Sequence, residues 1–332
     1  MKKILLATLL LTSSIVSAAL NQAALMKAFT SVVMIRGYHE NGSLGYGSGV
    51  IVGENQIVTN CHVLRSTSKP WVSQGEYTYS ITSVRSSPWH DLCLLDVHGL
   101  NRDPVPIGSS LNLKKGQELV GIGHSNGAPV PLTTGGYVLS TYPLDDGNVI
   151  HTSAKFRLGA SGSGLFDLDG NLIGINTFKT TGYGSYYAVP VEWLKDLQQQ
   201  DVLDEFPIQG RALWEEDEDQ KPFFLKIAIP KVKENWEQVK NIAIDWTKKE
   251  PKNSEAWFEL AMAQKNLGNN VDFIDSLNKS LKQDENNIDA LFELALDANQ
   301  KNLAQYQKYY ELLSSINLAK AEELKELVGK SK

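Results

Sequence analysis

The chain has 332 residues, of which 42% are hydrophobic and 21% are charged. This is the composition of a globular protein, and the length allows about two domains. The formal net charge is −6, from 32 basic and 38 acidic residues. An acidic chain without a basic patch is a poor candidate for binding nucleic acid or an anionic membrane surface.

The first 18 residues have the pattern of a secretory signal peptide. Lys2 and Lys3 precede a short apolar run at 4–11, and small side chains follow at 16–18. The run is too short for a membrane span, which needs about 20 residues, and no cysteine follows it to carry a lipid anchor. We therefore expect residues 1–18 to be removed and the chain to be exported without a membrane anchor, as a periplasmic or secreted protein. The alternative is a buried N-terminal helix.

Residues 24–200 are rich in short runs of β-branched and aliphatic residues. The runs at 31–36, 49–52, 92–95 and 171–175 are separated by Gly, Asn, Asp, Ser and Pro. Short strands at close spacing with polar turns predict an all-β barrel or sandwich.

Residues 201–222 change in character and contain an unbroken acidic run at 215–219. A run of like charges resists burial. We therefore predict an exposed acidic linker between the β-rich region and the rest of the chain.

Residues 223–332 are predicted to be all-α. The hexapeptide AWFELA at 256–261 recurs as ALFELA at 290–295, an offset of 34 residues (290 − 256). This is the period of tetratricopeptide helix pairs, and the region resembles a short array of them; the alternative is an unrelated bundle of helical hairpins. Stacked helix pairs leave a concave side that suits peptides or partner proteins, so we expect a protein partner or substrate to bind there.

Three separate stretches of the β-rich region carry candidate chemistry, and they supply His62, Asp91 and Ser161 in chain order. A serine hydroxyl needs a base to take its proton, and a buried carboxylate must hold that base in the correct tautomer. Gly159 and Gly162 allow a tight turn around the serine. Such a turn can point the N–H groups of Gly159 and Ser161 into one oxyanion hole.

The β-rich region resembles the chymotrypsin-like serine peptidases, most closely their bacterial HtrA-like, or trypsin-like, branch. Seven stretches in order carry the resemblance: GSGV at 47–50, IVTNCH at 57–62, DLCLL at 91–95, GIGHSNG at 121–127, GASGSG at 159–164, GINT at 174–177 and YAVP at 187–190. The resemblance implies two six-stranded β-barrels with the site between them. It also implies peptide or protein substrates and no metal or cofactor.

The resemblance assigns a role to each candidate residue: His62 is the general base, Asp91 its orienting carboxylate, and Ser161 the nucleophile. Asp96 is the competing carboxylate. It lies five positions after Asp91 and so faces the opposite side of a strand, and we therefore prefer Asp91.

The substrate pocket is less readable from the sequence. In the family that the chain resembles, the residue six before the nucleophile lies at the base of the primary pocket, which is Lys155 here, with Thr177 as a second lining residue. Lys155 can pair with an acidic substrate side chain. Alternatively it points outward, and the pocket takes small apolar residues.

The chain departs from the family pattern at two places. Ala160 stands where trypsin-type zymogens carry an aspartate, so activation by a newly cut N-terminus is not expected. The helical region stands where HtrA-like proteins usually carry a PDZ domain, which raises the hypothesis that it regulates the barrels.

The only two cysteines are Cys61 and Cys93. Cys61 precedes His62, and Cys93 follows Asp91 by two positions, which places it on the same face of a strand as Asp91. If Asp91 reaches His62, Cys93 lies close to Cys61. We therefore predict a disulfide between them; the alternative is two buried thiols.

Taken together, the residues and the resemblance predict an exported serine endopeptidase with a helical partner-binding region. The alternatives are a catalytically silent barrel that serves as a protein-binding scaffold, and an esterase that uses the same three residues.

Overall fold

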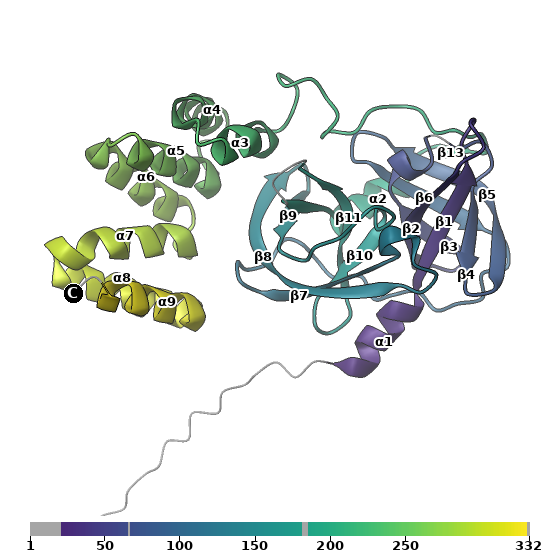
Figure 1. Ribbon diagram of the computed structural model, residues 1–332, viewed down its shortest axis with the longest axis horizontal. Coiled ribbons are helices and arrows are strands. Elements are labelled where there is room, and N and C mark those ends of the chain that lie inside the picture. Colours follow the sequence, from purple (N-terminus) through teal and green to yellow (C-terminus); the bar gives the residue numbers. More distant parts are fainter. Residues whose placement is uncertain (1–20, 66, 181–184, 331–332) are drawn as a thin grey trace, which may run out of the picture.

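The computed structural model describes residues 21–65, 67–180 and 185–330. The predicted signal peptide lies outside the described residues. Two β-barrels follow a short first helix, α1 (Gln22–Thr30), and an arc of helices stands beside the second barrel (Figure 1). The prediction of a double six-stranded barrel followed by helices is confirmed.

The first barrel is built from six antiparallel strands in the spatial order β4-β1-β2-β3-β6-β5, and a pairing between β5 and β4 closes it. Its inward faces are lined by buried aliphatic residues, as the β-type runs in the sequence predict. The strands are β1 (Val32–Tyr38), β2 (Leu44–Gly53), β3 (Gln56–Thr59), β4 (Trp71–Gln74), β5 (Tyr77–Ser87) and β6 (Leu92–Val97).

The second barrel is a closed ring of six strands in the order β10-β11-β12-β9-β8-β7. A fully buried cluster that includes Leu119, Ile150 and Leu165 fills part of its interior. The strands are β7 (Glu118–Gly123), β8 (Leu132–Leu144), β9 (Gly147–Thr152), β10 (Ser163–Phe166), β11 (Leu172–Lys179) and β12 (Tyr186–Pro190).

The helical region begins after residues 201–222, which we call the connecting segment. The two copies of the repeated hexapeptide fall on α5 and α7, and side chains of asparagine cap the N-termini of α4, α5, α7 and α8. The helices are α3 (Phe223–Val232), α4 (Trp236–Lys249), α5 (Ser254–Asn266), α6 (Asn270–Gln283), α7 (Ile288–Lys301), α8 (Leu303–Ile316) and α9 (Leu318–Lys330). Among the described residues, none of the helices has the length and apolar character required to cross a bilayer.

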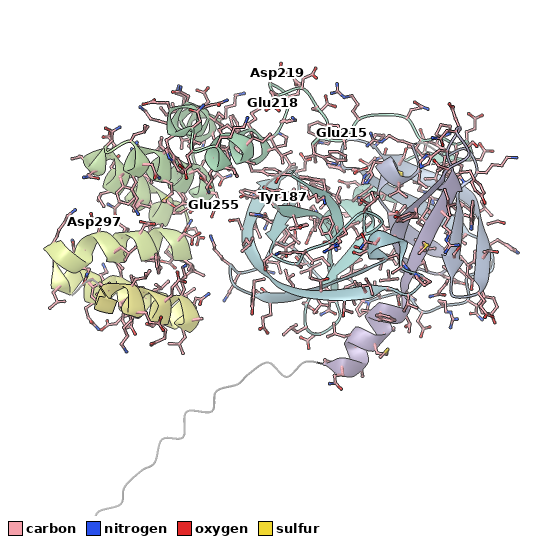
Figure 2. The ribbon with its side chains drawn as sticks, in the orientation of Figure 1. Tyr187, Glu215, Glu218, Asp219, Glu255 and Asp297 are labelled. Carbon is pink, nitrogen blue, oxygen red and sulfur yellow. A yellow bond between two sulfur atoms is a disulfide. The ribbon has the colours of Figure 1, made fainter. Side chains whose placement is uncertain are left out.

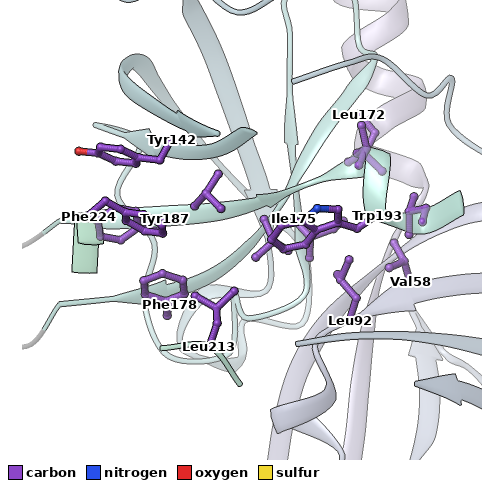
Figure 3. Packing of buried hydrophobic residues seen from close by; sticks show 14 of the residues in the cluster. Val58, Leu92, Tyr142, Leu172, Ile175, Phe178, Tyr187, Trp193, Leu213 and Phe224 are labelled. Carbon is purple, nitrogen blue, oxygen red and sulfur yellow. The ribbon is translucent and has the colours of Figure 1, made fainter. Parts of the chain in front are cut away.

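The largest hydrophobic cluster joins the three parts of the molecule. Figure 3 shows it extending from Val58 and Leu92 of the first barrel to Phe224 of α3. Phe224 stacks on Tyr142 of β8, with ring centroids 4.6 Å apart. The first helices are therefore packed on the second barrel, and a cleft of about 590 Å³ lies beside this contact.

His151 of β9 lines the same cleft and makes the stability of the fold sensitive to acid. Burial, together with the nearby charges of Lys231 and Lys115, lowers the pKa of His151 to about 4. The unfolded chain, in which a histidine has a pKa of about 6.5, binds more protons than the folded chain between these two values. The free energy of unfolding must therefore fall as the pH drops from about 6.5 towards 4.

We expect His151→Gln to lose less stability than the wild type between pH 7 and pH 4.5, by about 2 kcal/mol. The measurement is urea unfolding of both proteins at both pH values. His98→Gln is the matched control, because His98 is an exposed histidine. Equal losses for all three proteins would show that His151 is not the group responsible.

Candidate active site

Strand pairing brings His62 and Asp91 to one end of the first barrel. β3 and β6 are antiparallel, with Thr59 opposite Cys93. The chain leaves β3 just after Thr59 and enters β6 just before Leu92, so both residues lie at the same edge of the sheet. His62 sits in the short 3-10 turn Cys61–Val63, and Asp91 takes a left-handed backbone conformation with φ of 54°.

The carboxylate of Asp91 is fully buried and accepts three N–H groups. Its Oδ1 accepts the backbone N–H of His62 at 2.8 Å, and its Oδ2 lies 2.6 Å from His62 Nδ1. Oδ2 also accepts the indole N–H of Trp214 at 3.2 Å. A buried charge needs such donors to offset its lost hydration.

The contact with Asp91 fixes the chemical state of the His62 ring. Because a carboxylate only accepts hydrogen bonds, Nδ1 must carry the proton in this pair, and Nε2 of the neutral ring is then left as an acceptor. The side chain of His62 is 23% exposed. An imidazole in this state has the lone pair that a general base requires.

Hydrogen bonds to the backbone oxygen of Asp91 also hold this residue in place. The side-chain amide of Asn60 donates to the backbone oxygen of Asp91 at 2.8 Å and to the hydroxyl of Thr177 at 3.0 Å. The backbone N–H of Cys61 also donates to the oxygen of Asp91, at 3.3 Å. These bonds join the histidine turn to the start of β6 and to β11 of the second barrel.

The glycine-rich stretch forms a tight turn that packs against the histidine segment. Gly159 and Gly162 have φ of 91° and 84°, a region that other residues rarely adopt. A Cβ atom on Gly162 would lie 2.1 Å from the backbone oxygen of Ser48 and 2.4 Å from Oγ1 of Thr59. Only glycine fits there, and the close approach seats Ser161 beside the residues that lead into His62.

Ser48 of β2 holds this turn in place, a role that was not predicted from the sequence. Its backbone N–H donates to the oxygen of Ser161 at 2.8 Å, and its buried hydroxyl donates to the oxygen of Gly159 at 2.8 Å. The same hydroxyl accepts the backbone N–H of His124 at 2.9 Å. One small side chain of the first barrel thus holds two loops of the second.

The predicted oxyanion donors have no partners within the described part of the chain. The N–H groups of Gly159 and Ser161 donate to no acceptor there, whereas the N–H of Ala160 between them donates to Arg157 at 3.0 Å. Likewise, the described residues include no hydrogen bond between Ser161 and the ring of His62. Catalytic bonds of this kind are often long without substrate.

The two predicted pocket residues differ in their surroundings. Lys155 is exposed and forms no ion pair with a described residue. Thr177 is buried, and its hydroxyl donates to the oxygen of Ile175 at 2.7 Å and accepts from Asn60. Among the described residues, no group of His, Cys, Asp or Glu side chains is arranged to hold a metal ion.

A disulfide joins Cys61 to Cys93, as predicted, with the two Cα atoms 5.0 Å apart. The competing carboxylate, Asp96, lies farther along β6 and bonds to Gln56, Ser83 and Arg85. Burial by itself raises the pKa of Asp96, but these three partners outweigh it and hold the pKa below its usual value.

A double barrel with a buried His–Asp pair and a glycine-rich serine turn defines the class of chymotrypsin-like serine peptidases. The comparisons agree. Residues 47–175 match the family described as trypsin-like peptidase domain. Among solved structures, the active form of the Rv3671c protease from M. tuberculosis has the same fold, with a TM-score of 0.50 and 20% identity over 59% of this chain and 91% of that chain.

Curated relatives are similar to the same half of the chain. Serine protease HTRA3 of Homo sapiens is 30% identical over 190 residues, which is 50% of this chain and 41% of the relative. The probable periplasmic serine endoprotease DegP-like of Chlamydia pneumoniae is 31% identical over 151 residues, 43% of this chain and 30% of the relative. The β-rich half of the chain therefore matches the trypsin-like peptidase domain and is similar to HtrA-type serine proteases.

One relative carries a different name. Anti-sigma-I factor RsgI9 of Acetivibrio thermocellus is 29% identical over 180 residues, 51% of this chain and 25% of the relative. The chain thus matches between 25% and 41% of the length of these three relatives.

Proposed function

We propose that the chain is an exported serine endopeptidase that hydrolyses peptide bonds through an acyl-enzyme. The observation that carries the proposal is the bond between His62 Nδ1 and the fully buried Asp91, at 2.6 Å, beside the tight turn that holds Ser161. A buried carboxylate that fixes the tautomer of an imidazole is the arrangement needed to activate a serine.

The reaction would proceed in two halves. Ser161 Oγ attacks the carbonyl carbon of the substrate while Nε2 of His62 takes the hydroxyl proton, and the N–H groups of Gly159 and Ser161 receive the oxyanion. The imidazolium then gives its proton to the leaving amine, and an acyl-enzyme on Ser161 remains. Water, deprotonated by the same imidazole, attacks the ester and releases the second product.

Labelling with a fluorophosphonate probe tests this proposal. We expect the wild type to be labelled at Ser161 and to cleave an unfolded protein substrate, and Ser161→Ala to do neither, because the probe reacts with an activated serine hydroxyl. Ser163→Ala is the matched control: Ser163 begins β10, two residues after Ser161, and its hydroxyl accepts a bond from the buried amide of Asn176. Absence of labelling in a folded wild-type protein would contradict the proposal.

The second candidate is a catalytically silent barrel that binds proteins. The similarity to a relative named as an anti-sigma factor is the observation that favours it. The same probe separates the two candidates, because a silent barrel would not be labelled.

For the pocket, we propose that Lys155 and Thr177 line the primary site. Cleavage of a peptide library by the wild type and Lys155→Ala decides between the two alternatives, an acidic preference that depends on Lys155 and a small apolar preference that does not.

We further propose that the helices α3 to α9 are tetratricopeptide-like and bind a protein partner or substrate. The 34-residue offset between the equivalent segments of α5 and α7 supports this assignment. Export is supported by the pattern of residues 1–18 and by the disulfide, since disulfides persist in oxidising compartments.

A further inference from the structure

The connecting segment is bound to the first barrel through much of its length. Its first residues form a short strand, β13 (Val202–Leu203), which pairs with β5. Ile208 is buried in the core of the first barrel. The N–H of Leu213 donates to the backbone oxygen of Trp89 at 2.9 Å, two residues before Asp91. The segment therefore passes close to Asp91 before it reaches α3. Figure 1 shows it as the loop that runs along the top of the barrels from β13 to α3.

This path of the connecting segment places Trp214 next to His62 and Asp91. The indole N–H donates to the same Oδ2 atom of Asp91 that binds His62 Nδ1. The indole and imidazole rings meet edge to face, with centroids 5.5 Å apart and an angle of 89°. The indole also stacks on Phe178 of β11, with ring centroids 5.7 Å apart. Trp214 is thus held between the two barrels while it contacts both members of the His–Asp pair.

Neighbouring residues of the connecting segment fix Trp214 in this position. Glu215 forms an ion pair with Arg65 and accepts the backbone N–H of Ala212 at 2.9 Å. Arg65 in turn lies 3.6 Å from Oδ1 of Asp91. Glu215 therefore links the connecting segment to Arg65, whose guanidinium group lies beside the buried carboxylate of Asp91. Figure 2 shows Glu215 at the upper side of the barrels, away from Glu218 and Asp219, which lie nearer the helices.

We propose that Trp214 is a positioning residue for the His62–Asp91 pair, supplied from outside the two barrels. Its N–H holds Oδ2 of Asp91 in the place where it receives His62 Nδ1–H, and its ring covers that bond against water. Both effects keep the imidazole in the orientation and tautomer needed at Ser161. This inference rests on the proposed function.

The test compares Trp214→Phe with the wild type in the full-length chain. Phenylalanine keeps an aromatic ring against Phe178 and removes the N–H. We expect kcat to fall about 10-fold to 100-fold, the range for a lost bond to a charged group, with KM within twofold of the wild type. The acid limb of the pH–rate profile should move to higher pH, because the Asp91 carboxylate loses a donor and then favours the imidazolium more strongly. Arg65 and Glu215 are the other charged groups beside the pair, and both are kept.

Trp257→Phe is the matched control. Its indole N–H also makes a hydrogen bond, to the oxygen of Pro251 at 2.9 Å, but it lies on α5. Titration with the fluorophosphonate counts the active sites in each preparation, and kcat is calculated per active site. Unfolded molecules in a Trp214→Phe preparation therefore do not lower the measured kcat.

The possible results distinguish the positioning role of Trp214 from the proposed peptidase function. An active wild type with unchanged kcat and pH profile in Trp214→Phe overturns the positioning role and leaves the proposed function intact. An equal loss in Trp257→Phe overturns it too, because the effect would not be specific to the site. A wild type that is folded but inactive and unlabelled overturns both claims.

Discussion

Replacing Asp91 by asparagine is expected to lower kcat about ten-thousandfold at pH 7. The amide oxygen can still accept the backbone N–H of His62, as Oδ1 does at 2.8 Å. Its NH2 group must then face both His62 Nδ1 and the indole N–H of Trp214, which donate to Oδ2 in the wild type. Donors cannot bond to donors, so the imidazole is driven to the tautomer with its proton on Nε2. That tautomer cannot take a proton from Ser161.

Hydrolysis of a peptide substrate at saturating concentration measures this effect. Asp96→Asn is the matched control. Asp96 lies on β6, the strand that begins directly after Asp91, and also accepts several hydrogen bonds, yet its replacement is not expected to affect kcat. An Asp91→Asn enzyme within tenfold of the wild type would remove Asp91 from the mechanism and make Asp96 the first alternative to examine.

Removing the disulfide is expected to lower the free energy of unfolding of the barrels by about 3 kcal/mol. The bridge closes a separation of 32 residues, and loss of this cross-link increases the entropy of the unfolded chain. Both sulfur-bearing residues are completely buried, so Cys61→Ala with Cys93→Ala leaves small cavities and removes no polar contact. Urea unfolding of the double variant and of the wild type measures the difference.

Reduction supplies the internal control. Dithiothreitol should shift the unfolding midpoint of the wild type towards that of the double variant, and should not change the double variant. If reduction leaves the wild-type midpoint where it was, the bridge contributes no stability. Because Cys61 adjoins His62 and Cys93 follows Asp91 by two residues, we also expect the double variant to lose part of its activity.

The sequence predicted those features that depend on local patterns. The glycines at 159 and 162 indicated the tight turn that the structure shows. The disulfide predicted between Cys61 and Cys93 is present, although Asp91 lies just before β6 in a left-handed conformation and therefore outside the strand alternation used to predict it. The order of the seven family stretches was enough to predict both barrels, because each stretch has a fixed place in that fold.

Contacts between distant segments could not be predicted in this way. Trp214 reaches Asp91 over 123 positions, and it lies next to an acidic run whose composition indicates only exposure. The one local signal was the tryptophan directly before five acidic residues. Exposing its large apolar side chain to water costs free energy, so it is expected to pack against another part of the chain. Ser48 could not be predicted for another reason: the sequence places it in a β-type segment, and nothing local shows that its hydroxyl joins two loops.

The path of the connecting segment also decides where the chain can be divided. A graft that joins these barrels to another partner-binding region after residue 200 would discard the tryptophan beside Asp91, whereas a join after residue 219 would carry it along. With the role proposed for Trp214, an exchange of the helices between related proteins would keep full activity only when the segment up to Asp219 is kept together with the two barrels.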